Sequence, residues 1–226
     1  MDTPPAFSRT HTFTIGELHY EAVPCSVGKT PQGEMTANGA IRMIIDRQLN
    51  DLKILDICCG VGIVGLTIFS KLKEKAIIKE IVFADINIFN LNSLQRTLKI
   101  NNLEHFLGKT IRYYLSNALI NIPNNEKFDI IVSNPPHYLG AEESKTLLSP
   151  RELGTYDIGW SFHDSFYKHC HNYLAEHGEV WFLENGSVAK ESDFLPFIKD
   201  NPNLRYLKRL EEYSDPHFFW MITQKV

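Results

Sequence analysis

The residues best suited to carry chemistry follow an apolar run in the middle of the sequence. Asn134, Pro135 and Pro136 end this run, and His137 and Tyr138 come directly after them. The prolines fix the backbone and carry no N–H group, so the Asn134 side chain can be held rigidly toward an incoming group. An amide oxygen that accepts a hydrogen bond from a substrate N–H aligns the nitrogen lone pair, as methyl transfer to nitrogen requires.

Three side chains near this motif are candidates to contact a substrate. His137 stands where it can accept the proton that an amine loses, and the alternative is a surface histidine beside a strand end. Tyr138 follows directly, and Tyr156 lies in a connection of about two dozen residues that ends at Trp160. Connections of this length are usually functional, and their aromatic rings can contact a cation or only pack the loop down. The expected catalytic residues are Asn134, His137, Tyr138 and Tyr156.

A glycine-rich turn forms a second candidate site. Gly60, Gly62 and Gly65 follow the apolar run Lys53–Cys59 and lead into a helix-length segment. Glycines let the backbone approach a ligand closely, and the first turn of a helix offers free N–H groups and a positive potential. A nucleotide-like ligand suits such a turn. The glycine spacing is also that of dinucleotide-binding domains, so the turn alone leaves NAD and S-adenosylmethionine open as the cofactor.

Acidic and amide side chains follow the next two strand-like runs. Asp85 lies near the end of the run Glu80–Ile86, where its carboxylate can accept hydrogen bonds from the ribose hydroxyls of either cofactor. Asn117 follows the third run, where its side chain and backbone can face adenine. The residues expected to bind the cofactor are Asp56, Cys58, Gly60, Gly62, Asp85, Ile86, Asn117, Ala118, Asn134 and Pro135.

Apolar strand-like runs alternate with helix-length segments from Leu52 onward, which is the pattern of a parallel sheet covered on both faces. The expected parallel strands are Lys53–Cys59, Glu80–Ile86, Ile111–Ala118, Phe128–Asn134 and Glu179–Glu184. The expected helices are Ile63–Lys73, Phe89–Asn101 and Phe162–Glu176. Ligands of open α/β folds bind at the carboxyl edge of the sheet, which is where Asn134 is expected.

The end of the chain departs from this alternation. Leu204–Tyr213 and His217–Lys225 are strand-like runs separated by only three residues, which suits a hairpin of antiparallel neighbours. Dinucleotide-binding Rossmann domains keep their strands parallel, whereas methyltransferases finish with an inserted antiparallel strand. The sequence therefore predicts a three-layer α/β fold with a Rossmann-like, seven-stranded, mostly parallel sheet and an antiparallel last strand.

Residues 1–50 are expected to form a short N-terminal cap, and residues 51–226 the S-adenosylmethionine-dependent methyltransferase-like domain. The first fifty residues contain aromatic-rich stretches such as Thr12–Tyr20, and a segment rich in glycine, proline and threonine from Pro24 to Gly39. They hold too few apolar residues for a core of their own, so we expect a lid over the cofactor.

Composition narrows the classes of partner. A net charge of −4 and a pI near 6.1 argue against binding nucleic acid by neutralising phosphates, and favour small-molecule or amide-bearing substrates. The sequence shows neither an apolar run of the roughly 20 residues that span a bilayer nor a secretory signal, so we expect a cytoplasmic protein without membrane contact. The four cysteines lack disulfide or zinc spacing, and His169 and His171 are too close in sequence to share a helix face, so no metal site is expected.

The glycine turn, Asp85 and Asn134–Pro136 resemble class I S-adenosylmethionine-dependent methyltransferases with an asparagine-proline-proline-aromatic motif. Within that class, Pro150–Ser187 is similar to the release-factor glutamine N-methyltransferases, in a stretch that leads through a helix into a strand ending at Leu183–Gly186. The resemblance covers roughly residues 50 to 190. It implies S-adenosylmethionine as the cofactor and an exocyclic or amide nitrogen as the methyl acceptor.

Two departures from that family bear on the substrate. His137 stands where the family has a tyrosine that packs on the target, and Tyr138 follows it. We expect the short cap of residues 1–50 to stand in place of the family's larger helical N-terminal domain, which engages the release factor. We therefore expect N-methylation of a small amine or amide, or of a protein side chain, held by residues 134–137.

Three other functions stay open at this point. The cap could close over S-adenosylmethionine so that its own amino group attacks carbon, as in azetidine-2-carboxylate synthases. Such a cyclase would release methylthioadenosine, whereas methyl transfer releases S-adenosylhomocysteine. A non-catalytic protein would bind the cofactor without turnover. A nicotinamide oxidoreductase is disfavoured by the Asn134–Pro136 motif and by the closing hairpin.

Overall fold

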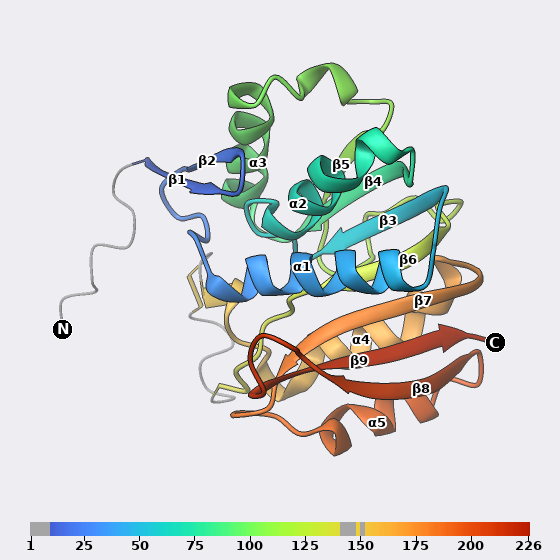
Figure 1. The fold of residues 1–226 in the computed structure, drawn as a ribbon. Helices are drawn as coiled ribbons and strands as arrows, with labels where there is room; N and C mark the ends of the chain where they lie inside the picture. The colour runs from blue at the N-terminus through green and yellow to red at the C-terminus, as the bar shows by residue number, and fades with distance from the viewer. Residues whose placement is uncertain (1–9, 141–147, 150–151) are drawn as a thin grey trace, which may run out of the picture.

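The computed structural model of the protein describes residues 10–140, 148–149 and 152–226. Its strands are β1 (His11–Ile15), β2 (Leu18–Ala22), β3 (Leu52–Ile57), β4 (Ile78–Asp85), β5 (Ile111–Leu115), β6 (Phe128–Ser133), β7 (Leu174–Asn185), β8 (Leu204–Glu211) and β9 (Phe218–Lys225). Its α-helices are α1 (Pro31–Asp46), α2 (Ile63–Leu72), α3 (Ile88–Ile100), α4 (Ser161–His169) and α5 (Glu191–Lys199). Strands β1 and β2 form a small hairpin, and the other strands form one sheet (Figure 1).

The large sheet has the strand order β5-β4-β3-β6-β7-β9-β8. Strands β3, β4, β5, β6 and β7 pair in parallel with one another, and β9 lies antiparallel between β7 and β8. This order confirms the expected Rossmann-like sheet with its terminal antiparallel hairpin. The strand order also places the ends of β3, β4 and β6 side by side, where the glycine turn, Asp85 and Asn134 follow.

Helices cover both faces of this sheet (Figure 1). Helices α1, α2 and α3 pack over one face in a core that includes Ile54 and Val132, while α4 and α5 pack over the other in a core that includes Leu55 and Ile131. Successive residues of a strand point to opposite faces, so each buried parallel strand contributes to both cores. This explains the nearly continuous apolar runs in the sequence.

The segment expected to be a lid contains helix α1. The Thr30 side chain accepts a hydrogen bond from the Gly33 N–H at 3.2 Å, and Pro31 is the first residue of the helix. A threonine cap and a proline in the first turn are both common at helix starts. A β-carbon at Gly39 would lie 2.5 Å from Trp220 Cζ2, so glycine permits the close approach of α1 to β9. Residues 31–46 thus belong to the helical layer. The boundary between a cap and the main domain at residue 50 stays a prediction.

The segment before α1 is fastened along one face of α3. Four of its backbone N–H groups donate to α3 side chains or to Asn101 beyond its end: His19 to Asn101, Glu21 to Thr97, Val23 to Ser93 and Val27 to Asn90. These bonds satisfy backbone groups that no neighbouring strand reaches. They hold the segment beside the carboxyl edge of the sheet.

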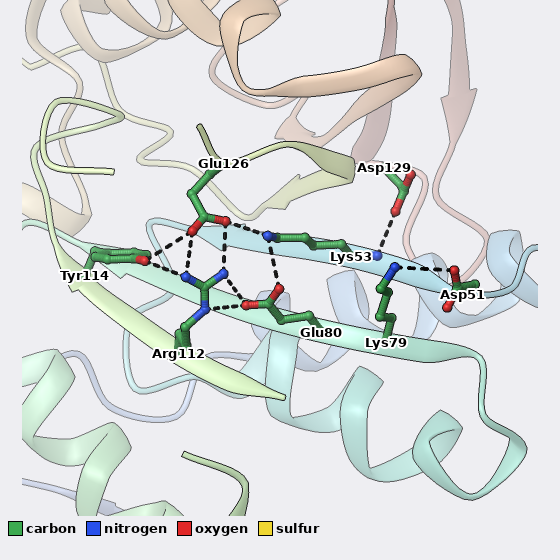
Figure 2. A network of polar contacts seen from close by, with 8 residues as sticks. All are labelled: Asp51, Lys53, Lys79, Glu80, Arg112, Tyr114, Glu126 and Asp129. Atoms are coloured by element: carbon green, nitrogen blue, oxygen red, sulfur yellow. Dashed lines mark hydrogen bonds and ion pairs between the residues drawn. The ribbon is translucent and has the colours of Figure 1, made fainter. Parts of the chain in front are cut away.

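A cluster of charged side chains lies at the opposite edge of the large sheet, near the amino ends of the strands (Figure 2). Lys53 of β3 contacts Glu80 of β4 at 3.0 Å and Glu126, just before β6, at 2.5 Å. Arg112 of β5 forms ion pairs with the same two carboxylates, and Tyr114 Oη lies beside it at 2.9 Å. The cluster therefore links neighbouring strands through largely buried charges.

We expect Glu126→Gln to lower the free energy of unfolding by about 3 kcal/mol, because it leaves Arg112 and Lys53 short of a nearly buried partner. Burial raises the pKa of Glu126, but hydrogen bonds from Arg112 and Lys53 outweigh burial and hold it below its usual range. The difference in free energy of unfolding between wild type and variant should therefore be largest at neutral pH and disappear on acidification. Denaturant unfolding at neutral and acidic pH measures it. Lys79→Gln, which removes the exposed pair with Asp51, is the control and should cost under about 0.5 kcal/mol.

Candidate functional site

A tight turn joins β3 to α2 at the carboxyl edge of the sheet. Cys58, Gly60 and Gly62 have positive φ angles of 55°, 56° and 86°. A β-carbon at Gly62 would lie 2.6 Å from Leu94 Cδ1, so both conformation and space require glycine there. The turn places the first residues of α2 beside a cavity.

Asp56 and Gly62, both expected to bind the cofactor, lie outside the lining of this cavity. Asp56 is fully buried, and its Oδ2 accepts a hydrogen bond from the Gly65 N–H at 2.8 Å. Gly62 faces Leu94 instead. Both residues stabilise the turn on the side away from the cavity. The expectation was wrong because residue spacing alone does not determine which side of a turn a residue faces.

We expect Asp56→Asn to flatten the pH dependence of stability. Burial raises the pKa of Asp56 to about 8, although the bond from Gly65 lowers it. The folded protein therefore holds this proton more tightly than the unfolded chain, and stability falls as the pH rises toward 8. The Asp56→Asn variant lacks this titrating group, which changes the free energy of unfolding by up to about 1.4 kcal/mol per pH unit. Denaturant unfolding of both proteins from about pH 5 to about pH 8 measures it, and equal slopes would contradict the assignment.

Asp85 ties the glycine turn to the end of β4. Its Oδ2 accepts the Gly60 N–H at 2.8 Å, and its Oδ1 accepts the Asn87 N–H at 2.8 Å and the Asn90 Nδ2 at 3.0 Å. Burial raises the pKa of Asp85 to about 6, although these bonds lower it. Since Oδ2 accepts one protein bond, it keeps a lone pair for a ligand hydroxyl.

One cavity of about 560 Å³ brings most of the expected site residues together. Its lining includes Cys58, Gly60, Asp85, Ile86, Asn117, Ala118, Asn134, Pro135, His137, Tyr138 and Tyr156. The sequence analysis missed other lining residues, among them Val27, Thr30, Gln32, Ser116, Asp157 and Ser165. The lining that the structure describes contains Asp85 and Asp157 but no lysine or arginine.

The motif after β6 is held against the end of β3. Ser133 Oγ donates to the Ile57 carbonyl at 2.6 Å, which fixes the point where Asn134 begins. The Asn134 Oδ1 lies 2.9 Å from His137 Nε2. His137 is 8% exposed, so its ring is largely enclosed. The amide and the imidazole thus form one unit at the cavity wall.

The expected contact residues Tyr138 and Tyr156 meet across the following loop. The Tyr138 N–H donates to the Thr155 carbonyl at 3.1 Å, and the Asp157 N–H donates to the Tyr138 carbonyl at 2.8 Å. The two tyrosine rings lie 6.1 Å apart between centroids, and both are partly exposed at the cavity. Their role in contacting substrate stays a prediction.

A buried polar chain behind this wall escaped the sequence analysis. Glu184, near the end of β7, faces His137 with its Oε2 at 3.7 Å from Nδ1, and places its Oε1 3.1 Å from His163 Nε2. His163 Nδ1 of α4 lies 2.5 Å from Asp157 Oδ2. Glu184, His163 and Asp157 are each at most 2% exposed. His163 and Glu184 each stand within an apolar run of the sequence, which could have indicated buried polar contacts. Only the fold shows that the two side chains meet.

The members of this chain shift one another's protonation. Burial lowers the pKa of His163, but the charge of Glu184 and the bonds to Asp157 and Glu184 outweigh burial and raise it to about 9. Burial raises the pKa of Glu184, but the charge of His163 and hydrogen bonds outweigh burial and lower it to about 2. At neutral pH the pair is therefore an imidazolium and a carboxylate.

Other sequence candidates do not form a site in the described residues. The four cysteines are free thiols, and no group of three or more histidine, cysteine, aspartate or glutamate side chains there could hold a metal ion. His171 Nδ1 instead accepts a hydrogen bond from Asn201 Nδ2 at 2.9 Å. None of the described helices has the length and apolar character needed to cross a bilayer.

Comparison with known protein families decides the class of this site. A family model described as the methyltransferase small domain matches residues 38–150, which is half of the chain. The chain belongs to this family. Membership in the methyltransferase small domain family confirms the expected S-adenosylmethionine-dependent methyltransferase class and its cofactor.

Individual members of known methyltransferase families match parts of the chain. The release factor glutamine methyltransferase of Clostridium botulinum is 37% identical over 100 residues, which cover 44% of this chain and 32% of the relative. The ribosomal RNA small subunit methyltransferase C of Serratia proteamaculans is 34% identical over 147 residues, which cover 65% of this chain and 39% of the relative. This methyltransferase small domain chain thus spans about a third to two fifths of these relatives.

Solved structures share its fold. The 16S rRNA N2 G1207 methyltransferase of T. thermophilus, in complex with AdoMet and guanosine, superposes with a TM-score of 0.64 at 17% identity, covering 99% of this chain and 52% of that one. The ribosomal protein L11 methylase of Lactobacillus delbrueckii gives a TM-score of 0.59 at 14% identity, covering 88% and 81%. At these identities the similarity concerns the fold.

Proposed function

We propose that this protein transfers a methyl group from S-adenosylmethionine to a nitrogen attached to a planar carbon, such as a carboxamide or an exocyclic ring amine. The observation that carries this proposal is that Asn134 lines the same cavity as the Gly60 turn and Asp85. Asn134 offers an amide oxygen on a backbone that the two following prolines fix, and these prolines carry no N–H donor of their own. Relatives named for glutamine and for ribosomal RNA methylation are in keeping with such an acceptor.

The residues present fit the cofactor. A β-carbon built on Gly60 has only Val27 Cβ near it, at 3.9 Å, so the turn leaves open space where a side chain would stand. Asp85 would accept hydrogen bonds from the ribose hydroxyls, and Asn117 and Ala118 would border the adenine. Asp85 and Asp157 place two carboxyl groups on the described lining, which favours a sulfonium cation over a pyrophosphate.

The bound cofactor would supply a methyl group made electrophilic by the positive charge on sulfur. As the new nitrogen–carbon bond forms, the carbon–sulfur bond of the cofactor would break to leave S-adenosylhomocysteine, and the proton lost by the nitrogen would pass to water. The protein supplies orientation: Asn134 Oδ1 accepts the substrate N–H, so that the nitrogen lone pair points into the cavity. Ser133 and the prolines keep the amide in place.

The acceptor class is wider than the sequence alone suggested. The net charge of −4 argued against nucleic acid, but relatives that share this domain are named as ribosomal RNA methyltransferases, and the chain spans less than half of them. Charge of the domain therefore does not exclude an RNA base as the acceptor. We propose recognition of the planar N–H group itself, by Asn134, with the larger molecule that carries it identified by experiment.

The test is incubation of the protein with methyl-deuterated S-adenosylmethionine and three acceptors: a glutamine-containing peptide, a guanine-bearing ribosomal RNA fragment and a simple aromatic amine. We expect S-adenosylhomocysteine and a trideuteromethyl group on nitrogen in at least one reaction. Methylthioadenosine formed from cofactor alone would overturn the proposal in favour of cyclisation. A label found on carbon or oxygen would overturn the choice of acceptor.

A further inference from the structure

The buried chain behind Asn134 consists of groups whose protons are fixed by their partners. His163 Nδ1 lies 2.5 Å from Asp157 Oδ2 and His163 Nε2 lies 3.1 Å from Glu184 Oε1, so an imidazolium that donates from both ring nitrogens satisfies both carboxyl groups. The positive charge of this imidazolium lies beside the Glu184 carboxylate, whose second oxygen faces His137 Nδ1. A histidine with a raised pKa of about 9 is consistent with this arrangement.

Stability alone does not explain a charged chain at this place. The His163 ring is stacked on Phe194 at 4.5 Å between centroids and lies edge-on to Phe162 and Phe182, within an aromatic core. Ion pairs in such surroundings are commonly no more stabilising than apolar side chains of similar volume, because desolvation is costly. We therefore consider how the buried side chains Asp157, His163 and Glu184 affect the position of the His137 ring.

The two ring nitrogens of His137 face protein groups, Nε2 toward Asn134 Oδ1 at 2.9 Å and Nδ1 toward Glu184 Oε2 at 3.7 Å. A proton acceptor for the substrate needs a nitrogen turned to the substrate, so this geometry disfavours the base role considered for His137. An imidazolium at His137 presents an N–H to each of these oxygens: its Nδ1–H faces Glu184, and its Nε2–H occupies one lone pair of the Asn134 oxygen and leaves the other for a substrate N–H.

We propose that Glu184 and His163 are positioning residues, which hold the His137 ring so that its Nε2–H fixes the Asn134 amide toward the methyl acceptor. The inference rests on the proposed function for its catalytic meaning, but the hydrogen bond between His137 and Asn134 and the 3.7 Å charge contact between His137 and Glu184 exist without substrate. The four elements that contribute to the chain are the end of β6, the loop before α4, α4 itself and the end of β7. Asp157 adds a second link, because its Oδ1 accepts the Phe162 N–H at 2.7 Å and so holds the start of α4.

The first test uses no substrate and no cofactor. Long-range ¹H–¹⁵N NMR should show N–H protons on both ring nitrogens of His163 and on both ring nitrogens of His137, because Nδ1 of His137 faces the Glu184 carboxylate and Nε2 faces Asn134 Oδ1. In Glu184→Gln, we expect the ring signals of His137 and the side-chain amide signals of Asn134 to shift. If both sets of signals match the wild type, the proposal is overturned whether or not the protein transfers methyl groups.

Glu179→Gln is the matched control for this test. Glu179 is also a buried carboxylate of β7, but it bonds Arg47 at 2.7 Å and Trp181 Nε1 at 2.7 Å, outside the cavity lining. We expect this variant to leave the His137 and Asn134 signals in place. Shifts of the same size in both variants would mean that any lost carboxylate on β7 disturbs the site, and would overturn the proposal.

The second test is a kinetic cycle with the acceptor that the methyl-transfer assay identifies. Glu184→Gln and His137→Phe should each lower kcat about tenfold or more, with cofactor affinity unchanged, and the double variant should add less than about twofold to His137→Phe. His137→Gln retains an N–H donor, so it should keep more of kcat than His137→Phe. Additive losses, or equal losses in the two His137 variants, would contradict action through the His137 N–H. If Glu184→Gln does not fold, the two His137 variants still decide the question.

Discussion

Asn134→Ala is expected to retain cofactor binding and to lower kcat for methyl transfer by about 100-fold or more. The amide oxygen stands at the cavity wall with the Gly60 turn and Asp85, so its loss removes the group that orients the acceptor and leaves the cofactor contacts. The measurement is single-turnover methyl transfer at saturating cofactor, together with calorimetric binding of the cofactor.

A matched control for this variant is Asn124→Ala. Asn124 accepts a hydrogen bond from Tyr173 Oη at 3.0 Å and lies outside the cavity lining. We expect its kcat to match the wild type. An Asn134→Ala enzyme with unchanged kcat would show that another group orients the acceptor. A loss of cofactor binding equal to the loss of kcat would assign Asn134 to the cofactor site instead.

Asp85→Ala should weaken S-adenosylmethionine binding by about 100-fold, because two effects combine. The variant removes the expected acceptor for the ribose hydroxyls, and it releases the Gly60 N–H, which Asp85 Oδ2 holds at 2.8 Å. Calorimetric titration measures the affinity, and thermal unfolding shows whether the fold persists. Asp164→Ala, which removes an exposed carboxylate of α4 outside the lining, should bind as the wild type does. Equal affinity in Asp85→Ala and wild type would remove Asp85 from the cofactor site.

Much of the sheet could be predicted from the sequence, because each buried parallel strand is a short apolar run. The run Phe128–Asn134 became β6, and the close spacing of the last two runs gave the β8–β9 hairpin. Helix α1 was not predicted, because its glycines, Pro31 and threonines are typical of a loop. Its start depends on the Thr30 cap, and its packing depends on the small size of Gly39 against Trp220.

The expected helix Phe162–Glu176 was too long. Helix α4 ends at His169, a short 3-10 turn follows, and β7 begins at Leu174, where it pairs with Phe128 at the start of β6. This pairing between distant parts of the chain outweighs the helical pattern of the sequence. A strand that extends beyond its apolar run is set by its neighbour, which the sequence alone does not specify.

The candidate site was predictable only in its local parts. The Gly60 turn and the Asn134 motif are each continuous in sequence, and their distinctive residue types can be recognised. The contribution of His163 and Glu184 depends on contacts between α4, β6 and β7. Those contacts join residues far apart in the chain, so no spacing rule reveals them.

A crystal structure of the full chain with S-adenosylmethionine bound tests the central claim most directly. The account predicts one cofactor molecule in the cavity, with its adenosyl group on the Gly60 turn and Asp85 and its methyl carbon directed toward the Asn134 amide. A cofactor bound elsewhere, or one whose methyl carbon points away from Asn134, would contradict it.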